Sequence, residues 1–190
     1  MILEGLVTTI DAQGMMHFAP MGPRVEPDFR RFQLRPFPTS NTYENLQRHR
    51  EGVLHVTDDV MLLARAAIGQ VTASPPSQPA ERIRGHVLTG ACRAYEFRVA
   101  HVDSSEPRMR LDCEVVHMHS FRDFFGFNRA KHAVVEAAIL ATRVSILPAA
   151  LIEADFARLA LIVEKTGGLQ ERDAFAFLDQ FVRISVKEKS

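Results

Sequence analysis

The sequence predicts an α+β protein in which the strands come first and the helices follow, and two observations carry this prediction. Residues 1–122 contain short runs rich in β-branched and aromatic residues, several of which alternate apolar and polar side chains, as half-buried strands do. Residues 129–187 contain Ala- and Leu-rich segments with few turn signals. A parallel α/β sheet would alternate strands with helices instead.

The strands are expected to form two antiparallel hairpins. The first joins residues 1–10 and 15–21 across the turn signal Asp11 to Gly14. The second joins residues 87–102 and 108–121 through residues 103–107. The segments expected to be extended are residues 1–10, 15–21, 29–34, 52–56, 87–102 and 108–121.

Helix boundaries follow from capping residues and glycines. Asn41 and Glu44 have the spacing of a capping box and predict a helix of two or three turns that stops at Gly52. Thr57 or Asp58 is expected to cap a second helix, which closes at Gly69, and residues 70–80 are expected to form a loop. The remaining helices are expected over residues 129–145, 149–165 and 171–184.

Composition excludes several classes of protein. The 190 residues have zero formal net charge and a pI near 7.1, so the broad basic face of a nucleic-acid-binding protein is not expected. The two cysteines, Cys92 and Cys113, are too few for a disulfide framework and are expected to be buried on neighbouring strands. No basic leader and no apolar run of membrane-spanning length is found, so a cytoplasmic protein without a membrane partner is expected.

The segment Thr39-Ser40-Asn41-Thr42 is the first candidate site. It leads into a predicted helix, whose N-terminus presents unpaired backbone N–H groups and the positive end of the dipole. Three hydroxyl groups beside such an end suit a bound phosphate. The alternative is that Ser40 or Asn41 simply caps the helix.

The segment from Phe124 to His132 is the second candidate. Asn128, Arg129 and Lys131 lie at a predicted helix start, where cations are mildly unfavourable because the dipole end is positive. This violation of a local rule indicates either an anion partner or a functional site. The alternative is a helix start exposed to solvent.

His117 and His119 share one face of a predicted strand and could chelate a metal. No third ligand is evident at a metal-like spacing, so no metal site is predicted. The chain also contains no Gly-x-Ser-x-Gly elbow, no Gly-x-Gly-x-x-Gly fingerprint and no P-loop. A serine hydrolase, a Rossmann dehydrogenase and a nucleoside triphosphatase are therefore not supported.

Taken together, the motifs resemble the family called domain of unknown function 447, whose barrel is similar to the split barrels of flavin reductases and pyridoxamine phosphate oxidases. The chain departs from the expected pattern at His55, where that family would carry an asparagine. The matching segments are Glu4 to Thr9, Ala19 to Gly22, Arg35 to Phe37, Thr39 to Leu46, Gly52 to Asp59 and Phe124 to Ala138.

This resemblance implies an antiparallel split β-barrel of Greek-key type over residues 1–122, and a C-terminal three-helix region over residues 123–190 that packs on the barrel and on a dimer interface. It also implies a homodimer that binds flavin mononucleotide (FMN). The phosphate would be held by Thr39, Ser40 and Thr42. The contacts implied elsewhere on the flavin are Met21, Gly22, Val56, Thr57, Asp58, Asn128, Arg129 and Lys131.

Three functions remain open from the sequence. The first is an FMN-dependent oxidoreductase that acts on an unknown small molecule. The second is a non-catalytic FMN carrier or sensor, which is favoured because no catalytic acid, base or nucleophile is evident. The third is a flavin-free dimeric interaction module. Residues 130–144 are apolar nearly all round, so this helix must be buried either within one subunit or against a second chain.

Overall fold

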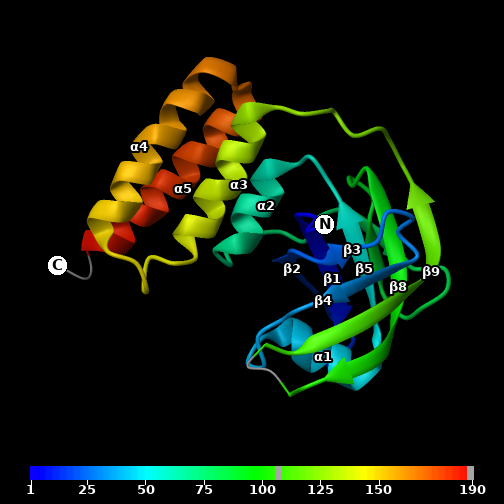
Figure 1. The fold of residues 1–190 in the computed structure, drawn as a ribbon. Helices are drawn as coiled ribbons and strands as arrows, with labels where there is room; N and C mark the ends of the chain where they lie inside the picture. The colour runs from blue at the N-terminus through cyan, green and yellow to red at the C-terminus, as the bar shows by residue number, and fades with distance from the viewer. Residues whose placement is uncertain (106–107, 188–190) are drawn as a thin grey trace. The chain divides into compact units, whose positions relative to one another are not determined.

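The structure, a computed structural model, describes residues 1–105 and 108–187. Two residues of the expected connection between the long strands, Glu106 and Pro107, lie outside the described residues. The chain forms two compact units (Figure 1). The barrel unit consists of residues 1–57 and 73–124, and the helical unit consists of residues 58–72 and the described residues from 125 onward.

The barrel unit is built on a seven-stranded antiparallel sheet that curls into a half-barrel, with the strand order β2-β1-β5-β8-β9-β4-β3 (Figure 1). Both predicted hairpins are present, as β1–β2 and β8–β9. The bounds of these strands are β1 Gly5–Ile10, β2 Met16–Met21, β3 Arg24–Val25, β4 Arg31–Leu34, β5 Glu51–Val56, β8 Arg93–Asp103 and β9 Arg110–Ser120.

The concave core of the half-barrel is apolar and is packed against helix α1 (Asn41–His49) through Tyr43 and Leu46. Phe97 and Leu111 are fully buried in the same cluster. Alternate residues of each strand reach this core, because successive side chains of a strand point to opposite faces. The neighbouring residues Val53 and Ala94 therefore belong to a separate cluster on the other face of the sheet.

That other face is covered by a second, two-stranded sheet, which the sequence does not predict. Strand β6 (Ser77–Pro79) pairs with β7 (His86–Leu88), so the prediction that residues 70–80 are a loop is wrong for three of them. Pro79 lies at the end of β6, where proline is tolerated. The run predicted over residues 87–102 is also interrupted, because a turn around Gly90 separates β7 from β8.

The structure shows which residues cap α1 and α2: of Ser40 and Asn41 it is Ser40, and for α2 the cap lies one or two residues beyond the predicted Thr57 or Asp58. The N-cap of α1 is Ser40, whose Oγ accepts the N–H of Tyr43, and Asn41 is instead the first helical residue. The cap of α2 (Val60–Ala67) is Asp59, whose carboxylate accepts the N–H of Leu62, and not Thr57 or Asp58. Adjacent polar residues all have capping chemistry, so the sequence alone does not choose among them.

Helix α1 also ends earlier than predicted. Its C-cap is Arg50, which adopts a left-handed conformation with φ of 56°, whereas Gly52 lies inside strand β5. Gly52 is needed there for close packing, since a Cβ at this position would lie 2.7 Å from the ring of Phe97. Phe29, expected in an extended segment, likewise has a positive φ of 55° and belongs to a turn before β4.

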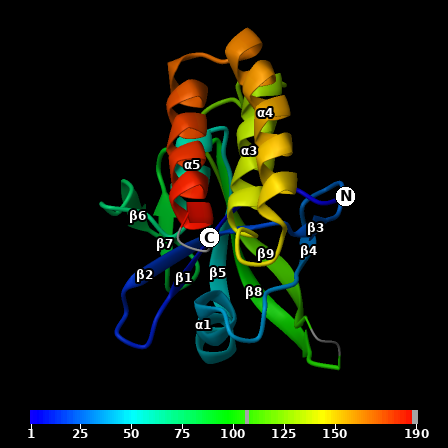
Figure 2. The same ribbon diagram turned by 90° about the vertical axis from the view of Figure 1, so that its left-hand side faces the viewer.

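The helical unit contains α2, α3 (Arg129–Ala141), α4 (Ala149–Thr166) and α5 (Leu169–Lys187); α3, α4 and α5 lie side by side in Figure 2. Helix α3 packs against the three others through a face of alanines and Val134. Its apolar composition is therefore explained by burial within this unit. None of the described helices is long and apolar enough to cross a membrane.

Both cysteines are buried and neither forms a disulfide, as predicted. Cys113 lies on β9, and Cys92 immediately precedes the neighbouring strand β8. Burial raises the pKa of the Cys113 thiol, so this side chain acts as a small apolar residue and not as a thiolate nucleophile.

Candidate functional site

The predicted phosphate-binding residues lie at the N-terminus of α1. Ser40 serves as the cap, and its Oγ also donates to the carbonyl oxygen of Phe37 at 2.7 Å, so its hydroxyl is already used within the chain. Thr39 is exposed and Thr42 is buried in the first turn. Within the described residues, neither threonine hydroxyl has a hydrogen-bond partner. Thr39 and Thr42 thus retain the donors that an anion at this helix end would need.

A second group of predicted residues lies at one end of the half-barrel. Gly5 on β1 pairs with Met21 on β2, and the register of β1 with β5, one step beyond Leu6 and His55, places Gly5 opposite Val56. Met21 and Val56 both pack at the edge of the concave core. Between them lies Gly5, which has no side chain. A Cβ at this position would lie 2.6 Å from the carbonyl oxygen of His55.

Gly22 and Thr57 follow these two strand ends directly. Gly22 is exposed, and a Cβ there would be tight, 3.2 Å from Cγ2 of Ile2. Thr57 is 7 % exposed at the end of β5. The structure therefore brings together the predicted ring contacts Met21, Gly22, Val56 and Thr57, whereas Thr39, Ser40 and Thr42 lie at the start of the separate element α1.

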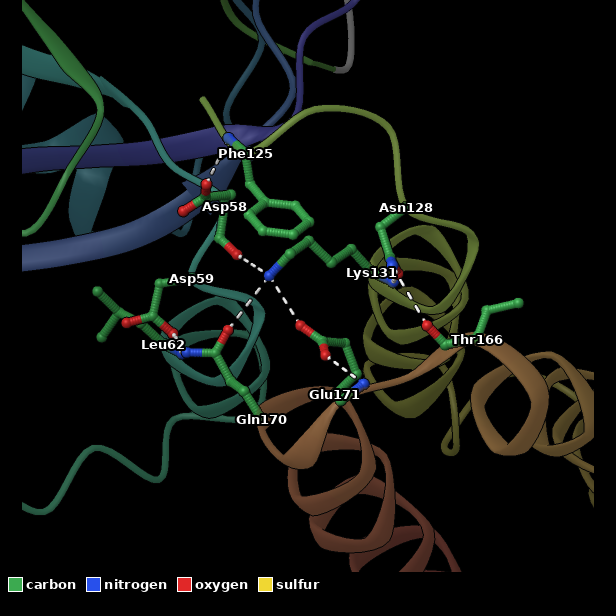
Figure 3. Close-up of polar contacts among 10 residues, drawn as sticks. Asp58, Asp59, Leu62, Phe125, Asn128, Lys131, Thr166, Gln170 and Glu171 are labelled. Atoms are coloured by element: carbon green, nitrogen blue, oxygen red, sulfur yellow. Dashed lines mark hydrogen bonds and ion pairs between the residues drawn. The ribbon is translucent and has the colours of Figure 1, made fainter. Parts of the chain in front are cut away.

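Three of the remaining predicted residues, Asp58, Asn128 and Lys131, belong to one polar network inside the helical unit (Figure 3). Lys131 lies at its centre: its Nζ donates to Oε1 of Glu171 at 2.8 Å and to the carbonyl oxygen of Asp58 at 2.8 Å. A carboxylate oxygen of Asp58 accepts the N–H of Phe125 at 2.9 Å. The anion partner that the sequence indicates for Lys131 is thus present within the chain, as Glu171.

Asn128 has a capping role in this network. Its Oδ1 accepts the N–H of Lys131, and its Nδ2 donates to the carbonyl oxygen of Thr166, which ties the start of α3 to the end of α4. Arg129 is exposed, and its guanidinium makes no ion pair with any described residue. Of the predicted cations, Arg129 therefore has its charge available to a ligand, while Lys131 is engaged.

The ion pair between Lys131 and Glu171 is well shielded, with side-chain exposures of 15 % and 9 %. Burial alone would raise the pKa of Glu171, but hydrogen bonds from Lys131 and from the N–H of Gly168 outweigh it and hold that pKa below its usual value. Glu171 therefore stays ionised and keeps Lys131 oriented toward Asp58.

His55, the departure from the expected family pattern, has a defined place in the barrel unit. Its ring is fully buried, with Nε2 accepting the N–H of Leu88 at 3.0 Å and Nδ1 lying 3.3 Å from the carbonyl oxygen of Leu6. This pattern requires a neutral ring with its proton on Nδ1. Burial lowers the pKa of His55 to about 4, so the ring is neutral at pH 7 and joins β1, β5 and β7.

Elsewhere in the barrel unit, the structure adds Glu81 to the histidine pair His117 and His119, for which the sequence showed no third ligand. Glu81, His117 and His119 present ligand-type atoms that all lie within 4.8 Å of one another. Glu81 is in the connection between β6 and β7, far along the chain from both histidines. No spacing rule could reveal it, because only the fold of the β6–β7 sheet brings it to β9.

The fold and this distribution of polar groups define an α+β protein with a curled antiparallel barrel and an appended helical unit. Residues 3–122 match the family model described as the N-terminal domain of a protein of unknown function (DUF447), and residues 128–180 match the accompanying DUF447 model. The chain belongs to this family, as the sequence motifs indicate. Comparison with curated protein sequences gave no match.

Solved structures confirm the split-barrel fold. An FMN-bound DUF447 protein from Methanosarcina mazei superposes with a TM-score of 0.82 at 20 % identity, and the alignment covers 95 % of this chain and 94 % of that one. A 2-nitrobenzoate 2-nitroreductase from Pseudomonas fluorescens gives a TM-score of 0.53 at 16 % identity, covering 62 % and 64 %. The flavin reductase of a styrene monooxygenase from Pseudomonas putida gives 0.51 at 11 % identity, covering 63 % and 80 %.

Proposed function

We propose that this protein binds FMN, with the phosphate at the N-terminus of α1 and the flavin ring beside the ends of β2 and β5. The observation that carries the proposal is the pair of threonines, Thr39 and Thr42, whose hydroxyls lack partners among the described residues at a helix end that favours anions. The similarity over nearly the whole chain to an FMN-bound member of the same family supports it.

The ring-side residues suit a flat aromatic ligand. Met21 offers a polarisable side chain that packs well against rings, and Gly22 lets a ligand approach the backbone closely. Val56 and Thr57 add one apolar and one hydroxyl-bearing side chain at the end of β5. Asp58, Asn128, Arg129 and Lys131 stay predicted contacts, and among them the exposed Arg129 is the most suitable for a phosphate or for a charged substrate.

Phosphate recognition can be separated from ring recognition by a thermodynamic cycle that combines one mutation with the change from FMN to riboflavin. In Thr42→Val the hydroxyl is lost with little change in shape. Loss of a hydrogen bond to a charged group costs about 1.5–3 kcal/mol, so FMN should bind roughly 10–100-fold more weakly. Riboflavin has no phosphate, so its affinity should be unchanged in this variant.

The matched control is Thr72→Val, which removes an exposed threonine hydroxyl outside the proposed site. Fluorescence titration of FMN and riboflavin into all three proteins measures the six affinities needed. An equal loss of FMN and riboflavin affinity in Thr42→Val would mean that Thr42 supports the fold and does not bind the phosphate. Unchanged FMN affinity would remove the proposed phosphate site altogether.

We further propose that the bound flavin serves an oxidoreductase that acts on a small molecule. Bound FMN would supply the electron-transfer chemistry, while the protein would position the ring and exclude water. Rapid reduction of the bound flavin by NADH or NADPH, followed by reoxidation with an acceptor, is the expected result. The alternative is a non-catalytic carrier. It is supported by the hydrogen bonds that Lys131 and Asp58 already make within the chain. Bound flavin that neither NADH nor NADPH reduces would establish this alternative.

A homodimer is also part of the proposal. In the described part of the chain, β9 pairs with β4 only along residues 111–114, so no strand covers the outer edge of residues 116–120. Val116 and Met118 in this stretch are 37 % and 53 % exposed, and exposed apolar strand edges are typical of pairing surfaces. Met118→Glu should shift the protein from dimer to monomer in light scattering after size exclusion; a wild-type monomer would refute the proposal.

A further inference from the structure

The convex face of the barrel sheet carries a row of titratable side chains that the proposed flavin site does not use. On this face, opposite to that of Leu54 and Tyr95, the strand register pairs Glu96 on β8 with His117 on β9, and Ala94 with His119. A β-bulge between Glu96 and Phe97 adds Val116 as an extra residue on β9 immediately before His117. Such bulges commonly re-aim a side chain near a functional site.

The connection between β6 and β7 brings a carboxylate over these two histidines. Oε2 of Glu81 lies 3.4 Å from Nε2 of His117, and its Oε1 lies 3.9 Å from Nδ1 of His119. The two imidazole rings are themselves adjacent, with centroids 4.6 Å apart and planes at 76°. Three ligand atoms of the types that bind transition metals therefore converge on one small space.

Glu96 fixes the orientation of this group from beneath. Its side chain is fully buried, and its two oxygens accept the N–H groups of Glu81 and Arg82, each at 2.7 Å. Oε1 of Glu96 also lies 2.7 Å from Nε2 of His119. Both oxygens of Glu96 therefore act as acceptors, as the two oxygens of a carboxylate do.

Glu96 also determines which nitrogen of His119 stays available to a ligand. In the contact at 2.7 Å, Nε2–H donates to Oε1 of Glu96, which leaves Nδ1 as the nitrogen that can bind a metal. Nδ1 lies 3.9 Å from Oε1 of Glu81. A histidine oriented by a buried carboxylate is a recurrent arrangement in zinc sites.

We propose that Glu81, His117 and His119 form a binding site for a divalent transition metal of the Zn²⁺ class, and that Glu96 is its positioning residue. Tetrahedral zinc with bonds of about 2.0–2.2 Å separates its ligand atoms by roughly 3.4 Å. The contact between Glu81 and His117 already has this length, and all three ligand atoms lie within 4.8 Å of one another, so the other separations need to shorten by at most about 1.4 Å.

The exposures of the ligand side chains indicate that Glu81 can move toward a bound metal and that solvent can reach the site. The Glu81 side chain is 57 % exposed and can move inward, whereas His119 is 7 % exposed and fixed. Three protein ligands leave a fourth position for water or for a small anionic ligand. Because Glu81 belongs to the β6–β7 connection, metal binding would also fasten this connection to β9.

Metal binding can be tested with the full-length chain, freed of any polyhistidine tag, stripped with a chelator and titrated with Zn²⁺. One equivalent is expected to bind to the wild type. The variants Glu81→Gln and His117→Gln should each weaken binding at least about tenfold, and Glu96→Gln about 10–100-fold. The matched control is His101→Gln, an exposed histidine on β8 that lies outside the cluster, and it should bind as the wild type does.

Two further readouts report on the geometry. Co²⁺ in place of Zn²⁺ should give the intense visible absorption of a tetrahedral site in the wild type and in His101→Gln, and lose it in His117→Gln. Trypsin cleavage after Arg82 and Arg84, both exposed in the β6–β7 connection, should slow on addition of Zn²⁺. Equal Zn²⁺ affinity of the wild type, Glu81→Gln and His117→Gln would overturn the proposal and leave Glu81 and His117 as an ion pair only.

Discussion

Acid should destabilise the barrel unit through His55, and the size of the effect follows from its burial. The folded-state pKa is about 4, against 6.5 for an exposed histidine, because burial disfavours the charged ring. The unfolded chain therefore binds a proton at this histidine below pH 6.5, whereas the folded chain binds it only as the pH approaches 4. The contribution of His55 to the free energy of unfolding is fully present above pH 6.5 and is lost at about 1.4 kcal/mol per pH unit below it.

At pH 4.5 the protonation of His55 in the unfolded chain lowers the free energy of unfolding by about 2.5 kcal/mol relative to pH 7. Urea unfolding of the wild type and of His55→Gln at both pH values measures it. Glutamine keeps a donor and an acceptor but does not titrate, so His55→Gln should lose about 2.5 kcal/mol less than the wild type between pH 7 and 4.5. His101→Gln, which removes an exposed histidine, should behave as the wild type does. Equal losses in the wild type and His55→Gln would refute the reasoning.

Two further predictions concern the fold. Lys131→Met leaves the carboxylate of Glu171 buried with the N–H of Gly168 as its remaining donor, and should lower the free energy of unfolding by about 3 kcal/mol. Lys165→Met, at an exposed lysine on α4, is the control and should change this free energy little. Denaturant unfolding compares the two variants, and equal free energies of unfolding would contradict the role given to the ion pair. Gly5→Ala places a Cβ 2.6 Å from the carbonyl oxygen of His55 and should lower the free energy of unfolding by about 2 kcal/mol. In the control Gly90→Ala, the added Cβ meets nothing within 4 Å. Thermal unfolding curves that coincide for these two variants would show that Gly5 is not constrained.

The order of strands and helices was predictable because it depends on local periodicity. Alternation along residues 110–120 reflects one mainly buried face, and this pattern is visible without a structure. The β6–β7 sheet was not predictable, since its strands have three residues each and pair only after the sheet beneath them has formed. The helix that closes at Gly69 was predicted, but the membership of residues 58–72 in the helical unit depends on the packing of α2 against α3 and α5.

The candidate sites were predictable to different degrees. Family motifs located the segment Thr39 to Thr42, and the structure adds that Ser40 is used as the cap. The violation of the helix-dipole rule indicated either an anion partner or a functional site. The structure shows Glu171 as a partner of Lys131, and it lies forty residues away along the chain, so it could not be named from the sequence. The same limit hid Glu81 from the two histidines of β9, because ligands from separate segments meet only in three dimensions.

The central claim, that this protein binds FMN, is tested most directly by the visible absorption spectrum of the purified chain after addition of excess FMN and removal of the unbound flavin. The account predicts the two flavin absorption bands at one FMN per chain, and release of FMN on heating, confirmed by its mass. A colourless protein that retains no FMN would contradict the account.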